Sequence, residues 1–225
     1  MTQTREAQYQ GCVELRDRQG LTPLGLMTNE TWHSDPRRLA IVLSRYKFVA
    51  KMLSGLRHVL EVGCADAFGT RIVLQEVPCL TAVDFDPIFV QDVQQRMDPR
   101  WSFECKVHDI LDGPVAGPFD GAFALDVLEH IPVEREDALV GNLANSLTPH
   151  GVLILGTPSL QSQVYASPAS QAGHVNCKDA AGLTALASRF FHNVFLFSMN
   201  DEVVHTGFYG MAHYLIALCA SKRLL

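Results

Sequence analysis

The stretch 59–70, Val-Leu-Glu-Val-Gly-Cys-Ala-Asp-Ala-Phe-Gly-Thr, limits the possible folds of this chain more than any other part of the sequence. Its first residues are apolar and mostly β-branched, which is typical of a short buried strand, and Gly63 ends that strand. Small residues follow, and the apolar run 72–74 has helical character. Strand, small-residue loop and helix are the layout of a nucleotide-binding crossover, in which N–H groups at the helix start can donate hydrogen bonds to a ligand.

Alternating strands and helices continue along the chain. An amphipathic helix is predicted over 36–54, with Ser34 or Asp35 as its N-cap. Residues 20–29, 160–177 and 198–211 are expected to be loops or connections. Strands are predicted at 59–62, 80–83, 101–107, 119–125, 152–155, 193–197 and 212–219, and helices at 72–78, 87–97, 133–147 and 179–189. Strands thus alternate with helices five times, which predicts an α/β doubly wound sheet of seven strands, mostly parallel with one antiparallel strand, and helices on both faces.

A carboxylate stands at the tip of the second predicted strand. Asp84 lies 21 positions after Gly63. In nucleotide-binding crossovers, an acidic residue about 20 positions past the glycine turn can accept two hydrogen bonds from a ribose diol. The spacing therefore favours a nucleoside-containing ligand at this end of the sheet.

Five segments together resemble the motifs of class I S-adenosylmethionine-dependent methyltransferases of the bacterial small-molecule type. One such motif is unspecific, but five in the right order over residues 50–220 are specific. The resemblance implies a Rossmann-like fold, S-adenosylmethionine as cofactor and S-adenosylhomocysteine as product. The five segments are Glu61 to Ala67, Val83-Asp84, His108 to Ile110, Asp120 to Pro132 and Leu147 to Leu155.

The resemblance also implies which residues meet the cofactor. Gly63 and the backbone of 64–67 would hold its methionine part, and Asp84 would bind the ribose hydroxyls. Asp109 and the Ile110 backbone would meet the adenine, against which Phe85 could pack. The whole predicted cofactor set is Glu61, Gly63, Cys64, Ala65, Asp66, Asp84, Phe85, Asp109, Ile110, Leu125 and Asp126.

The first motif departs from the family pattern, because the usual G-x-G-x-G becomes Gly63-x-Ala65-x-Ala67. Alanine tolerates a positive φ less well than glycine, so right-handed or extended backbone angles are expected at both alanines. Asp66 is expected either to turn toward the amino group of the cofactor or to cap the loop.

Histidines are the candidate catalytic residues. Methyl transfer to a hydroxyl or an amine is helped by a base, and the unperturbed pKa of histidine is near neutrality. The candidates are His130, His174 and His205, and the sequence does not choose among them.

Asp126-x-x-Glu129-His130 has a second interpretation, as a divalent-cation site that a later histidine completes. It resembles the Glu-x-x-Glu-His metal site of plant small-RNA 2′-O-methyltransferases. Leu-Glu-His-Ile after strand four is also common in metal-free members of the superfamily, so the prediction is that no metal is bound.

The methyl acceptor is expected to be a small molecule that accepts through oxygen, such as a sugar or a secondary-metabolite intermediate. We expect residues 1–55 to form a helical lid or substrate-binding segment and residues 56–225 to form the cofactor-binding domain. Arginines and lysines of helix 36–54, Arg45 among them, could meet a phosphate or carboxylate on the acceptor. The predicted substrate contacts are Trp32, Arg38, Tyr46 and His174.

Composition limits the possible binding partners and the cellular location. A formal charge of −6 argues against a nucleic-acid or anionic-membrane partner. The six cysteines form no Cys-x-x-Cys pair, which favours reduced thiols in a cytoplasmic protein. The polar segment 1–10 does not resemble a signal peptide, and the longest apolar run, 214–220, is too short to span a bilayer. A monomer or a homodimer is expected.

Two other functions remain open at this point. A nicotinamide-dependent oxidoreductase shares the acidic second-strand tip but would want G-x-G-x-x-G, which Gly63-x-Ala65-x-x-Phe68 fits poorly. A catalytically inactive methyltransferase-like binding module is compatible with the alanines at 65 and 67.

Overall fold

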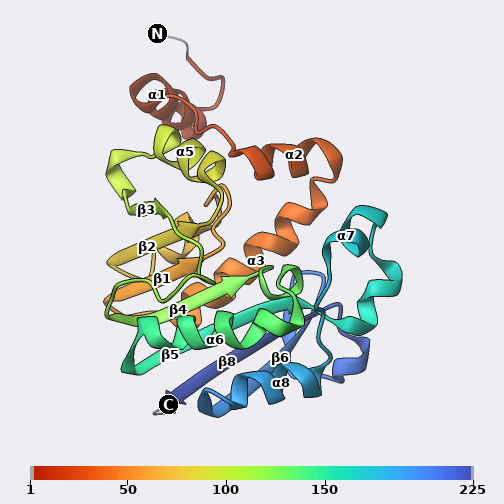
Figure 1. Ribbon diagram of the computed structural model, residues 1–225. Coiled ribbons are helices and arrows are strands. Elements are labelled where there is room, and N and C mark those ends of the chain that lie inside the picture. The colour runs from red at the N-terminus through yellow and green to blue at the C-terminus, as the bar shows by residue number, and fades with distance from the viewer. Residues whose placement is uncertain (1–2, 224–225) are drawn as a thin grey trace.

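The computed structural model describes residues 3–223, and Figure 1 shows their arrangement. Residues 1–2 and 224–225, at the ends of the predicted segments 1–55 and 56–225, lie outside the described residues. Eight strands form one sheet in the order β3-β2-β1-β4-β5-β8-β6-β7. The strands are β1 (His58–Val62), β2 (Cys79–Asp84), β3 (Glu104–Val107), β4 (Phe119–Leu125), β5 (Leu147–Pro158), β6 (Phe191–Asn200), β7 (Val203–His205) and β8 (Tyr214–Lys222).

Helices cover both faces of the sheet, as predicted. Along β1 the side chain of Val59 packs with α3 and α5, while Leu60 and Val62 pack in a second cluster with α6 and α8. This alternation follows from the two-residue period of a strand. The helices are α1 (Gln10–Gln19), α2 (Leu26–Ser34), α3 (Arg37–Met52), α4 (Thr70–Val73), α5 (Pro87–Arg96), α6 (Glu136–Ser146), α7 (Pro168–Gly173) and α8 (Ala180–Ser188).

The α/β doubly wound fold is confirmed, but the predicted number of strands is wrong. The connection 198–211 contains the additional strand β7, which pairs with Ser198–Asn200 of β6. Two residues join these strands, and Asp201 has a positive φ of 48° that closes the tight turn. Both β7 and β8 run against the direction of the parallel strands, rather than one strand only. A three-residue strand is too short to show a hydrophobic period.

Three further expectations about local structure are wrong. Residues 20–29 are not all loop, because α2 begins at Leu26. The segment 160–177 contains a 3₁₀ helix, Leu160–Tyr165, and α7, whose N-caps are Ser159 and Ser167. The helix after the first loop, expected over 72–78, is only the short α4.

The N-terminal helices extend from the sheet in Figure 1, and α3 connects them to its core. Val49, Ala50 and Leu53 at the carboxyl end of α3 are buried in the cluster that contains Val59. Within residues 3–223 there is no helix with the length and apolar character needed to cross a membrane.

Candidate active site

The parallel strands bring the predicted acidic residues to one edge of the sheet. Strands β1, β2, β3 and β4 pair in parallel, so their carboxyl ends lie together. Gly63, Asp84, Asp109 and Asp126 directly follow these ends or close them. Ligands of open α/β sheets bind outside the carboxyl ends of the strands. The edge is therefore the first candidate for a binding site.

The loop after β1 contains left-handed backbone at three positions. Gly63 has φ +74°, and a Cβ there would collide with the side chain of Val127. Ala65 and Ala67 have φ values of 45° and 51°, so the expectation of right-handed or extended angles is wrong. Hydrogen bonds hold these angles, because Ala65 N–H donates to Asp84 Oδ2 at 2.8 Å and Ala67 N–H to the Cys64 carbonyl at 2.7 Å. The two alanines thus adopt the left-handed backbone conformation that glycine usually adopts.

Two of the predicted cofactor carboxylates are held by backbone N–H groups. Asp84 is buried, and its Oδ1 accepts from Asp86 N–H at 2.9 Å while its Oδ2 accepts from Ala65. Asp109 Oδ1 accepts from Leu111 N–H at 2.9 Å. Each carboxylate oxygen has a second lone pair to offer a ligand. Phe85, beside Asp84, exposes 70% of its surface, whereas Ile110 is buried.

Other predicted cofactor residues are engaged inside the protein. Glu61 accepts hydrogen bonds from the hydroxyls of Tyr46 at 2.9 Å and Thr70 at 2.5 Å, and burial raises the pKa of Glu61 to about 7. Asp66 accepts from Thr28 N–H at 2.6 Å and so caps the first turn of α2. The side chains of Cys64 and Leu125 are buried in the core.

Asp126 forms an ion pair with a residue of α3. Asp126 has φ 56°, and both of its carboxylate oxygens accept from Arg45 Nη1, at 2.8 and 2.6 Å. The Arg45 guanidinium lies over the ring of Tyr214, 3.7 Å from its centroid. Within the described part of the chain, Arg45 Nε and Tyr214 Oη are buried without a hydrogen-bond partner. Arg45 was expected to meet an acidic group of the acceptor, but its pairing with Asp126, which is 81 residues away, was not predicted.

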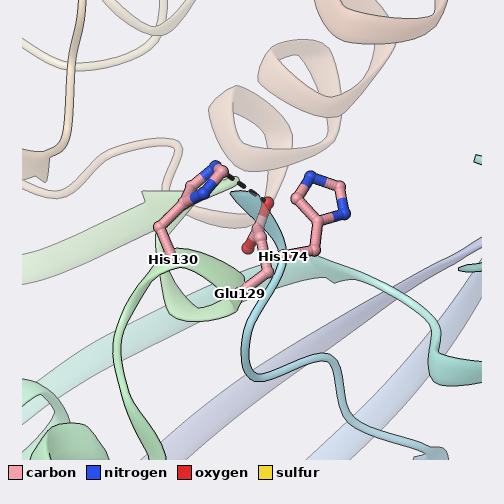
Figure 2. Close-up of side chains that lie close together, drawn as sticks. All are labelled: Glu129, His130 and His174. Carbon is pink, nitrogen blue, oxygen red and sulfur yellow. Dashed lines mark ion pairs between the residues drawn. The ribbon is translucent and has the colours of Figure 1, made fainter. Parts of the chain in front are cut away.

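The structure brings two of the three candidate histidines together. The ring centroids of His130 and His174 are 5.2 Å apart, and buried Glu129 lies between them (Figure 2). His205 lies on β7, where Ser198 and Asn200 hydrogen-bond to its two ring nitrogens. His205 is therefore separate from the pair.

A cavity of about 250 Å³ lies beside this pair. His174 and Arg45 contribute to its lining, as do His213 and Tyr214, which come from the connection into β8 and from β8 itself. Burial lowers the pKa of both His174 and His213. His213 was missed from the sequence, because nothing near it in the chain indicates a site.

Three predicted substrate residues do not line this cavity. The half-buried Tyr46 ring packs edge-on against Phe123 and lies so close to Gly69 that a Cβ there would collide with it. Trp32 is exposed on α2, and Arg38 is exposed on α3. A second cavity, of about 810 Å³, lies between the segment 19–23, the loop residues 66–68 and α5.

Comparisons with known proteins agree with this fold. Residues 59–151 match the family model described as a methyltransferase domain. The N-methyltransferase NodS from Bradyrhizobium japonicum WM9 is 20% identical, with a TM-score of 0.61, over 84% of this chain and 99% of that one. The DhpI-SAM-HEP complex is 16% identical, with a TM-score of 0.61, over 97% and 99%. Among curated protein sequences, none matches the chain.

The fold is that of class I S-adenosylmethionine-dependent methyltransferases, and the match over residues 59–151 indicates a methyltransferase. The alternative of a nicotinamide-dependent oxidoreductase is wrong. Residues 59–151 would have to bind the nicotinamide cofactor, and they match a methyltransferase domain instead.

Proposed function

We propose that the chain transfers the methyl group of S-adenosylmethionine to an oxygen of a small acceptor molecule. The observation that carries the proposal is the arrangement of Asp84. The same carboxylate that shapes the loop after β1 stands at the tip of β2, next to the exposed ring of Phe85. A ribose could bind to the carboxylate while its base stacks on the ring. The DhpI complex contains SAM, which supports this cofactor for a chain of the same fold.

The cofactor supplies a methyl group that its sulfonium has already activated, so the protein mainly has to position the two reactants. We assign the cofactor contacts to the backbone of 63–67 and to Asp84, Phe85, Asp109 and Ile110. Glu61 and Asp66 are better assigned to holding α2, α3 and α4 around the loop, because their hydrogen bonds go to those helices.

The acceptor is assigned to the cavity of about 250 Å³. This volume accommodates a small molecule. Polar groups line it, with the Arg45 guanidinium and the imidazoles of His174 and His213 among them. An oxygen acceptor must lose a proton, and the Glu129, His130 and His174 cluster borders the cavity where that proton would be removed.

We further propose that residues 1–55 act as a lid over this site. Arg45 on α3 reaches the cavity, and the start of α2 is fixed by the loop that would hold the cofactor.

The six cysteines form no disulfide, which supports a cytoplasmic location.

Calorimetric titration with S-adenosylhomocysteine, NAD and NADP in parallel tests the cofactor. We expect micromolar binding of S-adenosylhomocysteine alone. Asp84→Asn should weaken it about 10- to 100-fold, because a hydrogen bond to a charged group contributes about 1.5–3 kcal/mol. The control is Asp112→Asn, a carboxylate exposed on the surface. Unchanged affinity in Asp84→Asn would show that the site is wrongly assigned, and absence of binding in the wild type would overturn the proposal.

A further inference from the structure

We propose that Glu129, His130 and His174 bind a divalent transition-metal cation at the acceptor cavity. One ligand atom from each residue lies within 4.8 Å of the others (Figure 2). The proposed role of the cation in methyl transfer rests on the proposed function, whereas its binding does not.

The backbone holds the three residues in place. Glu129 and His130 end a 3₁₀ turn after β4, and His174 directly follows α7. The N–H groups of Val175 and Asn176 both donate to the Glu129 carbonyl, at 2.8 and 3.1 Å. Two segments that are distant in the sequence are thereby joined at the cluster.

Hydrogen bonds set the tautomer of both imidazoles. His130 Nδ1 lies 3.0 Å from the Gly173 carbonyl, which can only accept, so this nitrogen carries the proton. His174 Nδ1 lies 2.8 Å from Gln163 Oε1. The amide of Gln163 is oriented by its own donation to the Ser159 carbonyl, at 3.2 Å. In both rings Nε2 therefore keeps its lone pair, as in histidines that bind a metal through Nε2.

A hydrogen bond also orients the Glu129 carboxylate. Glu129 exposes 1% of its surface, and its Oε2 accepts from the Thr157 hydroxyl at 3.1 Å. Its Oε1 lies 4.0 Å from His130 Nε2, which is too far for a hydrogen bond. A cation about 2.1 Å from each ligand can bridge that separation.

The ligand set identifies the class of cation. Two neutral imidazoles and one carboxylate suit Zn²⁺, Mn²⁺, Fe²⁺ or Co²⁺, whereas Mg²⁺ and Ca²⁺ prefer oxygen ligands. Asp126, the other acidic residue of the motif, is not a ligand here, because Arg45 binds both of its oxygens.

Three protein ligands leave coordination positions on the cation open. Because His174 lines the cavity, these open positions lie at the cavity. An acceptor hydroxyl that occupies one of them loses its proton to water more readily. Its oxygen then forms the new C–O bond while the C–S bond of the sulfonium breaks, and S-adenosylhomocysteine leaves as a neutral thioether. The acceptor class is thus a small molecule with a hydroxyl that can coordinate a cation.

The test is titration of chelator-treated, full-length protein with Co²⁺, followed by visible absorption, and with Zn²⁺, followed by calorimetry. We expect one cation per chain. His130→Ala, His174→Ala and Glu129→Gln should each weaken binding at least 10-fold. Gln163→Leu keeps all three ligands but releases the His174 ring, and should weaken binding about 10-fold. His192→Ala, which removes an exposed imidazole on β6, should change nothing.

Titration of the same proteins with S-adenosylhomocysteine separates the two proposals and shows that each variant is folded. Cofactor binding without cation binding would overturn the metal site and leave the proposed function standing. Cation binding that the three ligand variants do not weaken would also overturn it. Cation binding without cofactor binding would overturn the proposed function instead.

Discussion

Two alanines in the loop after β1 adopt a conformation that alanine disfavours. Ala65 and Ala67 both have positive φ, and the left-handed region costs a residue with a Cβ about 1–2 kcal/mol. The hydrogen bonds from Ala65 to Asp84 and from Ala67 to Cys64 maintain these angles in the folded state. The loop is therefore a place where the folded protein holds backbone strain.

We predict that Ala65→Gly stabilises the protein. Glycine removes the strain, and its greater entropy in the unfolded chain offsets about 0.5–1 kcal/mol of the gain. The net increase in the free energy of unfolding should be about 0.5–1 kcal/mol, with a rise in Tm of about 1–4 °C. Thermal unfolding followed by circular dichroism measures it.

The matched control is Ala40→Gly, at an exposed position within α3. There the same substitution should destabilise by about 0.5–1 kcal/mol, because the backbone angle is helical and only the entropy changes. A lower Tm for both variants would contradict the strain at Ala65.

Single residues were predictable where their role depends on nearby sequence. Asp84 was found because its distance from Gly63 along the chain is set by one strand, one loop and one helix. The φ of Ala65 was not predictable, because a partner on the neighbouring strand imposes it. Arg45 and Asp126 meet only after the chain has folded, so no sequence signal joins them.

At the scale of elements, α2 shows why one helix was missed. Its N-cap position is Gly25, which has no side chain to cap the helix. The cap comes from Asp66, which lies 38 residues after Thr28, the residue whose N–H donates to it. A Cβ at residue 25 would collide with Asp66 and Arg96, so the glycine is needed for this close approach. By contrast α8, whose cap Asp179 is adjacent in sequence, was predicted almost to the residue.

We predict that Asp66→Ala loosens α2. Loss of a cap costs about 0.5–2 kcal/mol, so the amides at the start of α2 should exchange with solvent about 2- to 30-fold faster. Hydrogen exchange read by mass spectrometry measures this for the peptide that contains Thr28. Asp179→Ala, which removes the cap of α8, should speed exchange in α8 and leave α2 unchanged. Equal exchange of α2 in wild type and Asp66→Ala would show that the cap is unimportant.

At the scale of the whole molecule, Glu61 joins the two parts of the chain. From β1 it binds Tyr46 of α3 on the N-terminal side and Thr70 of α4 on the other. The fold class was predictable from the sequence, because the order of strands and helices repeats locally. The contacts of Glu61 with Tyr46 and Thr70 were not predictable. The sequence around a buried glutamate in a strand does not show whether its side chain contacts a ligand or a neighbouring helix.

The raised pKa of Glu61 makes global stability depend on pH. The folded state holds this proton up to about pH 7, whereas the usual value is 4.5, so the folded protein binds more protons in between. The contribution of Glu61 to stability is greatest below pH 4.5 and falls as pH rises to about 7, by up to about 1.4 kcal/mol per pH unit.

We therefore expect the difference in unfolding free energy between wild type and Glu61→Gln to fall between pH 5 and 7 and then level off. Urea unfolding at pH 5, 6, 7 and 8 measures it. Glu14→Gln, at an exposed position on α1, should follow the wild-type profile. Parallel profiles for wild type and Glu61→Gln would show that Glu61 does not titrate in this range.

The larger cavity has a consequence for regulation. The segment 19–23 forms one of its walls, and loop residues Asp66, Ala67 and Phe68 contribute to another. Any compound that fills this space and steadies the loop would raise the affinity for cofactor. Thermodynamic reciprocity then requires the cofactor to raise the affinity for that compound by the same factor. A binding screen run with and without S-adenosylhomocysteine would thus report on both sites at once.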